Sequence, residues 1–138
     1  MGRRNNKMKI FLSVFFVFAA MAVFVIGNQP LGVKRIEASF IYSNKSGFEI
    51  EPDKLTFGAL QQNQSASRDV SIENDYDFPV MVKIKTSGEI KDNLIVSKNN
   101  FELSPKESVV LTFAANPLDD FVEYRRYNGE VMIITERV

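Results

Sequence analysis

The stretch KLTFGALQQNQSASRDVSIENDYDFPV, residues 54–80, decides how this chain is interpreted. Leu55 and Phe57 flank a polar residue, and after a polar connection Val70 and Ile72 alternate with polar neighbours. Alternation of apolar and polar residues is typical of a strand with one buried face. The stretch therefore predicts two strands joined by a polar connection and followed by a turn rich in Asn, Asp and Pro.

The same period of two continues on both sides of this stretch. Turn signals separate seven to nine short strands at intervals of about 8–12 residues, which is typical of an all-β sandwich. We expect the strands to be antiparallel and to occupy residues 35–138, with no helix among them. The predicted inward-facing residues outside the opening stretch are Ile36, Ala38, Phe40, Tyr42, Phe48, Ile50, Val80, Val82, Ile84, Val109, Leu111, Phe113, Val131 and Ile133.

An apolar run, IFLSVFFVFAAMAVFVI, precedes this body and contains a single polar side chain. Its 17 residues would form a helix about 26 Å long, close to the ~30 Å hydrocarbon core of a bilayer. Four basic residues stand ahead of the run, a pattern that places the N-terminus in the cytoplasm. We therefore predict a basic cytoplasmic tail at 1–9, a transmembrane signal-anchor at 10–27, a linker at 28–34 and an extracytoplasmic domain at 35–138.

A removed signal peptide is the alternative to the anchor. Ala20-Met21-Ala22 has the small-x-small form of a cleavage site, and Val25-Ile26-Gly27 is a second, weaker match. Cleavage at either site would produce a secreted protein instead of a single-pass protein of the cell membrane.

Composition excludes several classes of function. The chain has no Cys and no His, so it can form neither a disulfide nor a Cys-His pair nor a Ser-His-Asp triad. The chain has 17 basic and 17 acidic residues, and four of the basic ones but none of the acidic ones precede residue 28. Residues 28–138 therefore have a net charge of −4. Binding to nucleic acid depends on Lys and Arg that neutralise phosphates. We expect no enzymatic activity, cofactor, metal, nucleic-acid partner or small-molecule substrate.

Acidic residues are the remaining candidates for catalysis or metal binding. A pair of carboxylates can perform acid–base chemistry when their environments separate their pKa values, and Ca²⁺ takes six to eight oxygen ligands. A solvated loop and a solvent-facing strand explain the same residues without either function. The residues concerned are Asn116, Asp119, Asp120 and Glu123 in an irregular segment, and Glu49 and Glu51 on a predicted strand.

The segment EYRRYNG, residues 123–129, is the predicted partner contact. Tyr124, Arg125, Arg126 and Tyr127 combine two residue types that are enriched at binding hot spots. The alternative is that the tyrosines pack over the end of the sandwich and the arginines pair with Asp119, Asp120 or Glu123.

Two further features have a functional and a structural interpretation. The tripeptides at Asn44 and Asn63 fit the N-x-[ST] glycosylation pattern and lie in predicted turns. The strand at 35–43 could pair in its own sheet. It could instead add to the edge of a neighbouring chain and build a filament or surface lattice, and the residues that would then enter the neighbour are Ile36, Phe40 and Tyr42.

A family resemblance rests on a series of short motifs. The series is a Pro, then Leu-x-Phe-Gly, a polar loop, a strand that ends in Asn, and a strand preceded by Pro; here these are Pro52, Leu55, Phe57, Gly58, Asn74 and Pro79. FELSPKESVVLTF and YNGEVMII continue the series. Residues 48–135 thereby resemble the immunoglobulin-like sandwiches of the PapD, major sperm protein and ASH type. The arginine that PapD-like pilus chaperones use to hold a terminal carboxylate has no counterpart here.

The resemblance implies an immunoglobulin-like sandwich and gives roles to three of these residues. Phe57 enters the core, Gly58 bends the chain where its strand ends, and Asn74 hydrogen-bonds the backbone of its own turn. We therefore predict a non-enzymatic, membrane-anchored cell-envelope protein. Its exterior domain would bind another envelope or surface protein, or itself, as an accessory or structural component of a surface assembly. A filament subunit and a periplasmic PapD-like chaperone are the alternatives.

Overall fold

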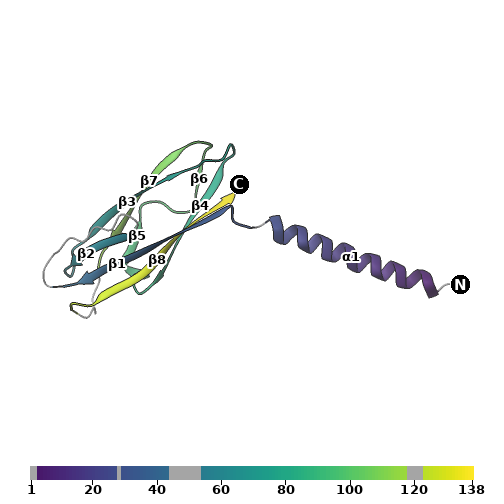
Figure 1. Ribbon diagram of the computed structural model, residues 1–138, viewed down its shortest axis with the longest axis horizontal. Helices are drawn as coiled ribbons and strands as arrows, with labels where there is room; N and C mark the ends of the chain where they lie inside the picture. Colours follow the sequence, from purple (N-terminus) through teal and green to yellow (C-terminus); the bar gives the residue numbers. More distant parts are fainter. Residues whose placement is uncertain (1–2, 28, 44–53, 118–122) are drawn as a thin grey trace. The chain divides into compact units, whose positions relative to one another are not determined.

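The computed structural model describes residues 3–27, 29–43, 54–117 and 123–138. They belong to two compact units, Met1–Pro30 and Leu31–Val138. Within the described residues, the first unit consists of the helix α1 (Arg3–Gly27). The second contains eight strands in two sheets and one short 3-10 helix, η1 (Lys91–Asn93) (Figure 1).

Apart from Lys9 and Ser13, helix α1 is apolar over Met8–Val25, and no part of this window is buried. By length and composition the helix could cross a membrane, although a signal sequence would look the same. The helix begins at Arg3, inside the segment 1–9 that we expected to be a tail. The residues RRNNKMK contain neither Pro nor Gly, so nothing in them interrupts helical hydrogen bonding.

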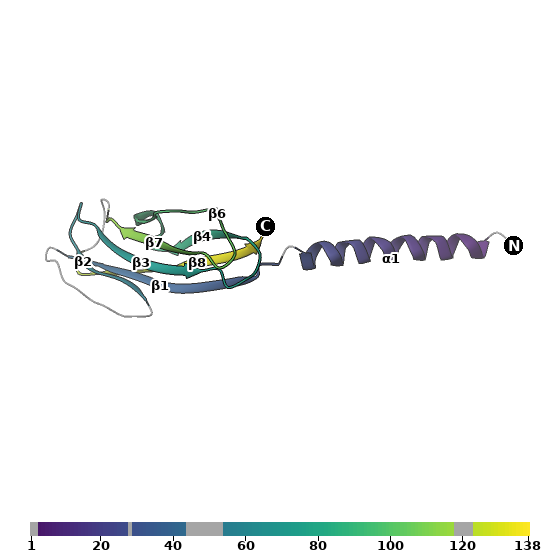
Figure 2. The same ribbon diagram turned by 90° about the horizontal axis from the view of Figure 1, so that it is seen from above.

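The second unit is a sandwich of a five-stranded sheet, in the order β2-β1-β8-β4-β6, and a three-stranded sheet, in the order β3-β7-β5. From β2 onward each successive strand lies in the other sheet. Figure 2 shows the strands of both sheets running along a common direction. The predicted all-β, immunoglobulin-like sandwich is confirmed. The strands are β1 (Gly32–Tyr42), β2 (Leu55–Leu60), β3 (Ala66–Glu73), β4 (Val80–Gly88), β5 (Leu94–Val96), β6 (Phe101–Leu103), β7 (Ser108–Ala115) and β8 (Arg126–Arg137).

Strand β1 lies between β2 and β8. It runs antiparallel to β8 and parallel to β2, so the expectation that all strands are antiparallel is wrong for the pair β1–β2. Parallel neighbours need a connection of about a dozen residues, and the segment between Tyr42 and Leu55 has that length. β1 begins at Gly32, within the predicted linker 28–34, because its first residues already pair with the end of β8.

The core lies between the two sheets and is built from one face of each strand. The alternation expected from the sequence is confirmed in β1, β4, β7 and β8, whereas Val70 and Ile72 are only half-buried because β3 is an edge strand. Phe48 and Ile50 lie outside the described residues. The buried apolar residues of highest volume include Phe40, Phe113, Ile90, Leu103 and Leu111.

Gly58 lies in the middle of β2 and not at its end. Its φ of 73° is left-handed, a conformation that glycine adopts without steric cost. The pairing of β1 with β2 shifts between Ser39 and Ile41, where β2 contains one residue more than β1. This arrangement is a β-bulge. The prediction that Gly58 ends its strand is therefore wrong, because the bulge accommodates the bend and the strand continues to Leu60.

We expect Gly58→Ala to lower the free energy of unfolding by about 1–2 kcal/mol, because a Cβ disfavours the left-handed conformation. Gly32→Ala is the matched control. Gly32 does not have a positive φ and a Cβ there would meet no atom within 4 Å, so a change below about 0.5 kcal/mol is expected. Urea unfolding of both variants measures the difference, and equal losses would contradict the role assigned to the bulge.

Asn74 joins two turns at one end of the sandwich, and its side chain is only 2% exposed. Its Nδ2 donates to the carbonyl oxygens of Phe78 and Leu103 at 3.0 Å and of Ser104 at 2.9 Å, and its Oδ1 accepts the N–H of Tyr76 at 3.1 Å. The expected bond to its own turn is present. The same amide also binds the turn between β6 and β7, which is distant in sequence.

The backbone of Asn74 adds two bonds to the same β6–β7 turn. Its N–H donates to the carbonyl of Glu107 at 2.9 Å and its carbonyl accepts the N–H of Lys106 at 3.0 Å. Within that turn, the Glu107 carboxylate accepts the backbone N–H of Ser104 at 2.8 Å. This bond, helped by the Ser104 side chain, lowers the pKa of Glu107. The contribution of the ionised carboxylate to stability is therefore lost as the pH falls through that lowered pKa.

Asn74→Ala should lower the free energy of unfolding by about 2–4 kcal/mol, because three carbonyls at a largely buried site lose their donor. Asn74→Asp should be at least as harmful, since a carboxylate donates nothing to a carbonyl. Asn128→Ala, at an exposed position of β8, is the control and should change stability by less than about 0.5 kcal/mol. Thermal or urea unfolding measures the loss of stability in each variant. A small loss in Asn74→Ala would show that the turns keep their structure without this amide.

Candidate interaction surface

The predicted contact residues lie at the end of the sandwich where β1 ends and β8 begins. Tyr124 is 65% exposed and has a left-handed backbone, with φ of 61°. Its N–H donates to the carbonyl of Tyr42 at 2.6 Å, and the N–H of Tyr42 donates to the carbonyl of Arg125 at 3.1 Å. These bonds extend the pairing of β1 with β8 and fix the position from which the Tyr124 ring reaches solvent.

The two arginines are exposed and have different neighbours. The Arg125 guanidinium forms an ion pair with Glu89 and lies 5.1 Å from the centre of the Tyr127 ring. Nη1 of Arg126 is 3.5 Å from Oγ of Ser39. The acids Asp119 and Asp120, suggested as alternative partners for these arginines, lie outside the described residues.

Tyr127 does not belong to the exposed surface. Its side chain is 6% exposed and its ring stacks on Phe40, with centroids 5.4 Å apart. The prediction of a partner contact is wrong for this residue, and the alternative of packing over the end of the sandwich holds. The physical reason is the period of β8, which turns Tyr127 inward together with Val131 and Ile133.

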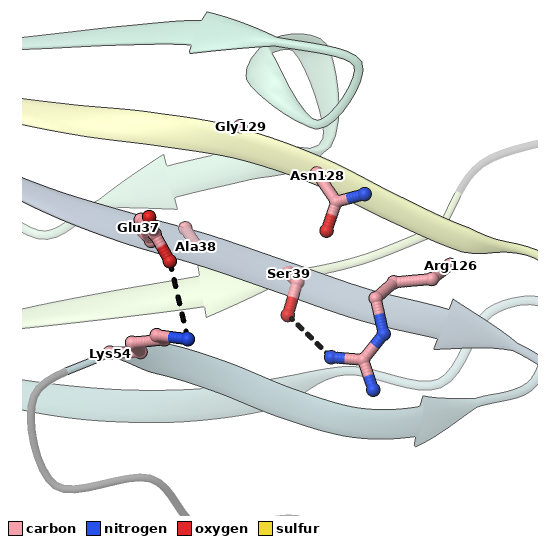
Figure 3. A pocket seen from close by; sticks show the side chains of 7 residues that line it. All are labelled: Glu37, Ala38, Ser39, Lys54, Arg126, Asn128 and Gly129. Atoms are coloured by element: carbon pink, nitrogen blue, oxygen red, sulfur yellow. Dashed lines mark hydrogen bonds and ion pairs between the residues drawn. The ribbon is translucent and has the colours of Figure 1, made fainter.

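A shallow depression of about 400 Å³ lies beside Arg126 on the face of β1 and β8 (Figure 3). Lys54 Nζ approaches Glu37 Oε2 at 3.3 Å across it. Guanidinium, ammonium, hydroxyl and amide groups converge here, and such donors suit the carboxylate and carbonyl oxygens of another protein. We call Tyr124, Arg125 and this depression the Arg126 surface. The depression is lined by Glu37, Ala38, Ser39, Lys54, Arg126, Asn128 and Gly129.

The segment considered for strand exchange is paired within its own chain. Ile36 and Phe40 are buried and Tyr42 is half-buried. All three lie in β1, which pairs with β8 from Gly32 to Ile41. Exchange would require this ladder to open, so assembly by exchange stays a prediction.

The remaining candidate residues are those predicted for glycosylation and for carboxylate chemistry or metal binding. Asn63 is exposed in the turn between β2 and β3, with φ of 61°, whereas Asn44, Glu49 and Glu51 lie outside the described residues. Glu123 is exposed. Over the described ranges no group of three or more Asp or Glu residues is arranged to hold a metal ion.

Sequence reasoning missed a second opening, between β1 and β3. It is lined by Val33 and Lys34 of β1 and by Ile72 and Glu73 of β3. One signal was present in the sequence. Lys34 lies on the same face of β1 as the buried residues Ile36 and Ala38, where an apolar residue would be expected. A charged residue at such a position indicates that the two sheets do not pack against each other there.

The fold defines a domain of the immunoglobulin-like β-sandwich class. Residues 46–125, more than half of the chain, match the family described as ASH, abnormal spindle-like microcephaly-associated, ASPM-SPD-2-Hydin. The chain belongs to the ASH family. No curated protein and no solved structure matches the chain. The matched region contains β2 to β7 and leaves out β1 and β8.

The two tyrosines at this end of the sandwich should respond differently to substitution. Tyr127→Ala removes a buried stacked ring and should lower the free energy of unfolding by about 3–5 kcal/mol. Tyr124→Asn keeps a residue that tolerates positive φ and should lower it by less than about 1 kcal/mol. Thermal unfolding monitored by circular dichroism compares them, and the reverse order would contradict the inward placement of Tyr127.

Proposed function

We propose that the chain is a single-pass membrane protein of the cell envelope whose ASH domain binds another protein on the extracytoplasmic side. In this proposal α1 is retained in the membrane and the N-terminus is cytoplasmic. The apolar, unburied window of α1 supports insertion. Four basic residues ahead of the window, with no acidic residue before Glu37, support the orientation.

The observation that carries the binding role is the membership of residues 46–125 in the ASH family, whose fold serves interaction. The Arg126 surface supplies an exposed tyrosine and two exposed arginines, which are residue types enriched at hot spots. The partner would be another envelope or surface protein, and the chain would act as an accessory or structural component of a surface assembly. A filament built by strand exchange is a second candidate, favoured only by the amphipathic period of β1.

The topology is tested on the full chain in membranes of its source cells. We expect the protein to resist extraction at alkaline pH, to retain its first 27 residues by mass spectrometry, and to expose its ASH domain to protease only from the extracytoplasmic side. Loss of the N-terminal residues from the mature protein would establish a removed signal peptide instead, and cytosolic recovery would contradict export.

The binding surface is tested by quantitative cross-linking of the full chain in the same membranes. Arg126→Glu should lower recovery of the cross-linked partner about tenfold, because a carboxylate at this position would repel the partner's carboxylate and carbonyl oxygens. Lys85→Glu is the matched control, since Lys85 is exposed on β4 and does not line the depression. Equal recovery with both variants would show that the partner binds elsewhere.

A further inference from the structure

The two sheets are not closed against each other along the first half of β1. β2 pairs with β1 only from Ala38 to Tyr42. Over the described residues, the stretch from Gly32 to Glu37 therefore has a strand partner on one side only, β8. Among the strands that the structure describes, none continues the five-stranded sheet past β1 along this stretch, because β2 begins only at Leu55.

The free backbone groups of this stretch can be located from the hydrogen-bond pattern. The N–H of Tyr42 donates to the carbonyl of Arg125, so Tyr42 uses its backbone groups toward the β8 side. In an antiparallel pair the direction of these groups alternates from residue to residue. The groups of Val33 and Arg35 consequently point away from β8, toward the open edge.

A groove lies between this edge and β3. One depression of about 440 Å³ is lined by residues of β1 and β3 that include Val33, Lys34 and Glu73. A second depression of about 250 Å³ shares Ile72, Glu73, Asp75 and Thr135 with the first. We call the two together the β1–β3 groove. Its apolar lining includes Ile72, Val80, Val82, Leu103 and Ile133.

The charges around the groove are mostly negative. Glu73 and Asp75 line both depressions, and no ion pair occupies their carboxylates within the described residues. Lys34 is the cation that lines the groove. Lys106 lies nearby, but its Nζ is bound to the backbone carbonyl of Asp75 and to the carboxylate of Asp77. The groove therefore offers apolar contacts together with two carboxylates that suit a basic group.

We propose that the β1–β3 groove receives an extended segment of another protein, which adds as a strand beside Val33 and Arg35. The segment places alternate apolar side chains between the two sheets and a Lys or Arg against Glu73 and Asp75. Addition of a strand to a free edge draws affinity from backbone bonds and specificity from the pockets for alternate side chains. This inference rests on the proposed function, because it adds to an interaction domain a second site, separate from the Arg126 surface, and names the class of partner for it.

The open edge and the charges favour this occupant over two others. A lipid headgroup offers no strand backbone to the N–H and carbonyl groups of the edge, and an anionic membrane would be repelled by Glu73 and Asp75. A second copy of the chain would bring a domain with the same net charge of −4, so like charges would oppose their association. Lys34 limits unselective pairing at the same edge, since inward-pointing charges are a common protection of exposed strands.

The test places a photo-cross-linking amino acid at Ser71, which is exposed and lines the groove from β3. The full chain is irradiated in membranes of its source cells and the cross-linked peptides are identified by mass spectrometry. We expect adducts with one segment of another protein, of alternating apolar residues with a Lys or Arg. The same amino acid at Ile95, exposed on β5 at the opposite edge of the small sheet, should give no such adduct.

Two variants with matched controls decide whether the groove is the site. Gly32→Phe fills the groove, since a Cβ at Gly32 meets no atom within 4 Å, and should lower the Ser71 adduct at least about fivefold. Ile95→Phe adds a ring on β5, at the opposite edge of the small sheet, and should leave the adduct unchanged. Glu73→Lys combined with Asp75→Lys should also lower the adduct, whereas Glu102→Lys, on an exposed position of β6, should not. Thermal unfolding confirms that each variant is folded.

Several outcomes would overturn the inference. They are no adduct at Ser71, an adduct with lipid or with a second copy of the chain, and an adduct that Gly32→Phe does not reduce. The same photo-reactive amino acid at Asn128, on the Arg126 surface, separates this failure from that of the proposed function. Partner adducts at Asn128 without any at Ser71 would support the proposed binding role of the domain but exclude the β1–β3 groove as a binding site. A lack of protein adducts at both positions would contradict both.

Discussion

The buried amide of Asn74 is the constraint on which one end of the sandwich depends. One side chain at the end of β3 satisfies carbonyls in its own turn and in the turn between β6 and β7. It thereby ties an edge strand of the small sheet to an edge strand of the large one. The backbone of Asn74 adds two hydrogen bonds to the same turn, so side chain and main chain together set the spacing of the sheets at that end. The shape of the β1–β3 groove, which shares Asn74 as a lining residue, follows from this local network.

Chain order explains why so much of the core comes from residues that are distant in sequence. Each strand from β2 to β8 crosses to the other sheet, so consecutive strands face each other across the core more often than they pair. The two strands outside the family match then complete the large sheet, with β1 and β8 paired over ten residues. The ASH region supplies both edges of that sheet and the whole of the small one, while β1 and β8 occupy its centre.

The period of two was enough to predict the class of fold and most of the core. Val80, Val82 and Ile84 are buried as expected because β4 has neighbours on both edges and a sheet above it. The parallel pairing of β1 with β2 could not be predicted, because periodicity describes which face is buried and says nothing of which strand lies alongside. The bulge at Gly58 was missed for a related reason: a glycine in an alternating segment is compatible with an end, a bend or a bulge.

The candidate site was harder to predict than the fold. Tyr124 and Tyr127 are three positions apart in a segment that looked uniformly suited to contact, yet a left-handed residue at Tyr124 directs one ring outward while the regular period of β8 buries the other. A non-glycine residue with positive φ is not visible in sequence. The opening between the sheets depends on how far β2 extends, which is a tertiary property; only Lys34 indicated it.

The pairing of Gly32 with Thr135 means that the polypeptide enters and leaves the sandwich at neighbouring points. Domains with adjacent ends commonly tolerate circular permutation. A few added residues could join Val138 to Leu31, and the exposed turn at Gln62 and Asn63 could supply new ends without disturbing a ladder. In such a permutant β8 and β1 would become a continuous hairpin at the centre of the large sheet.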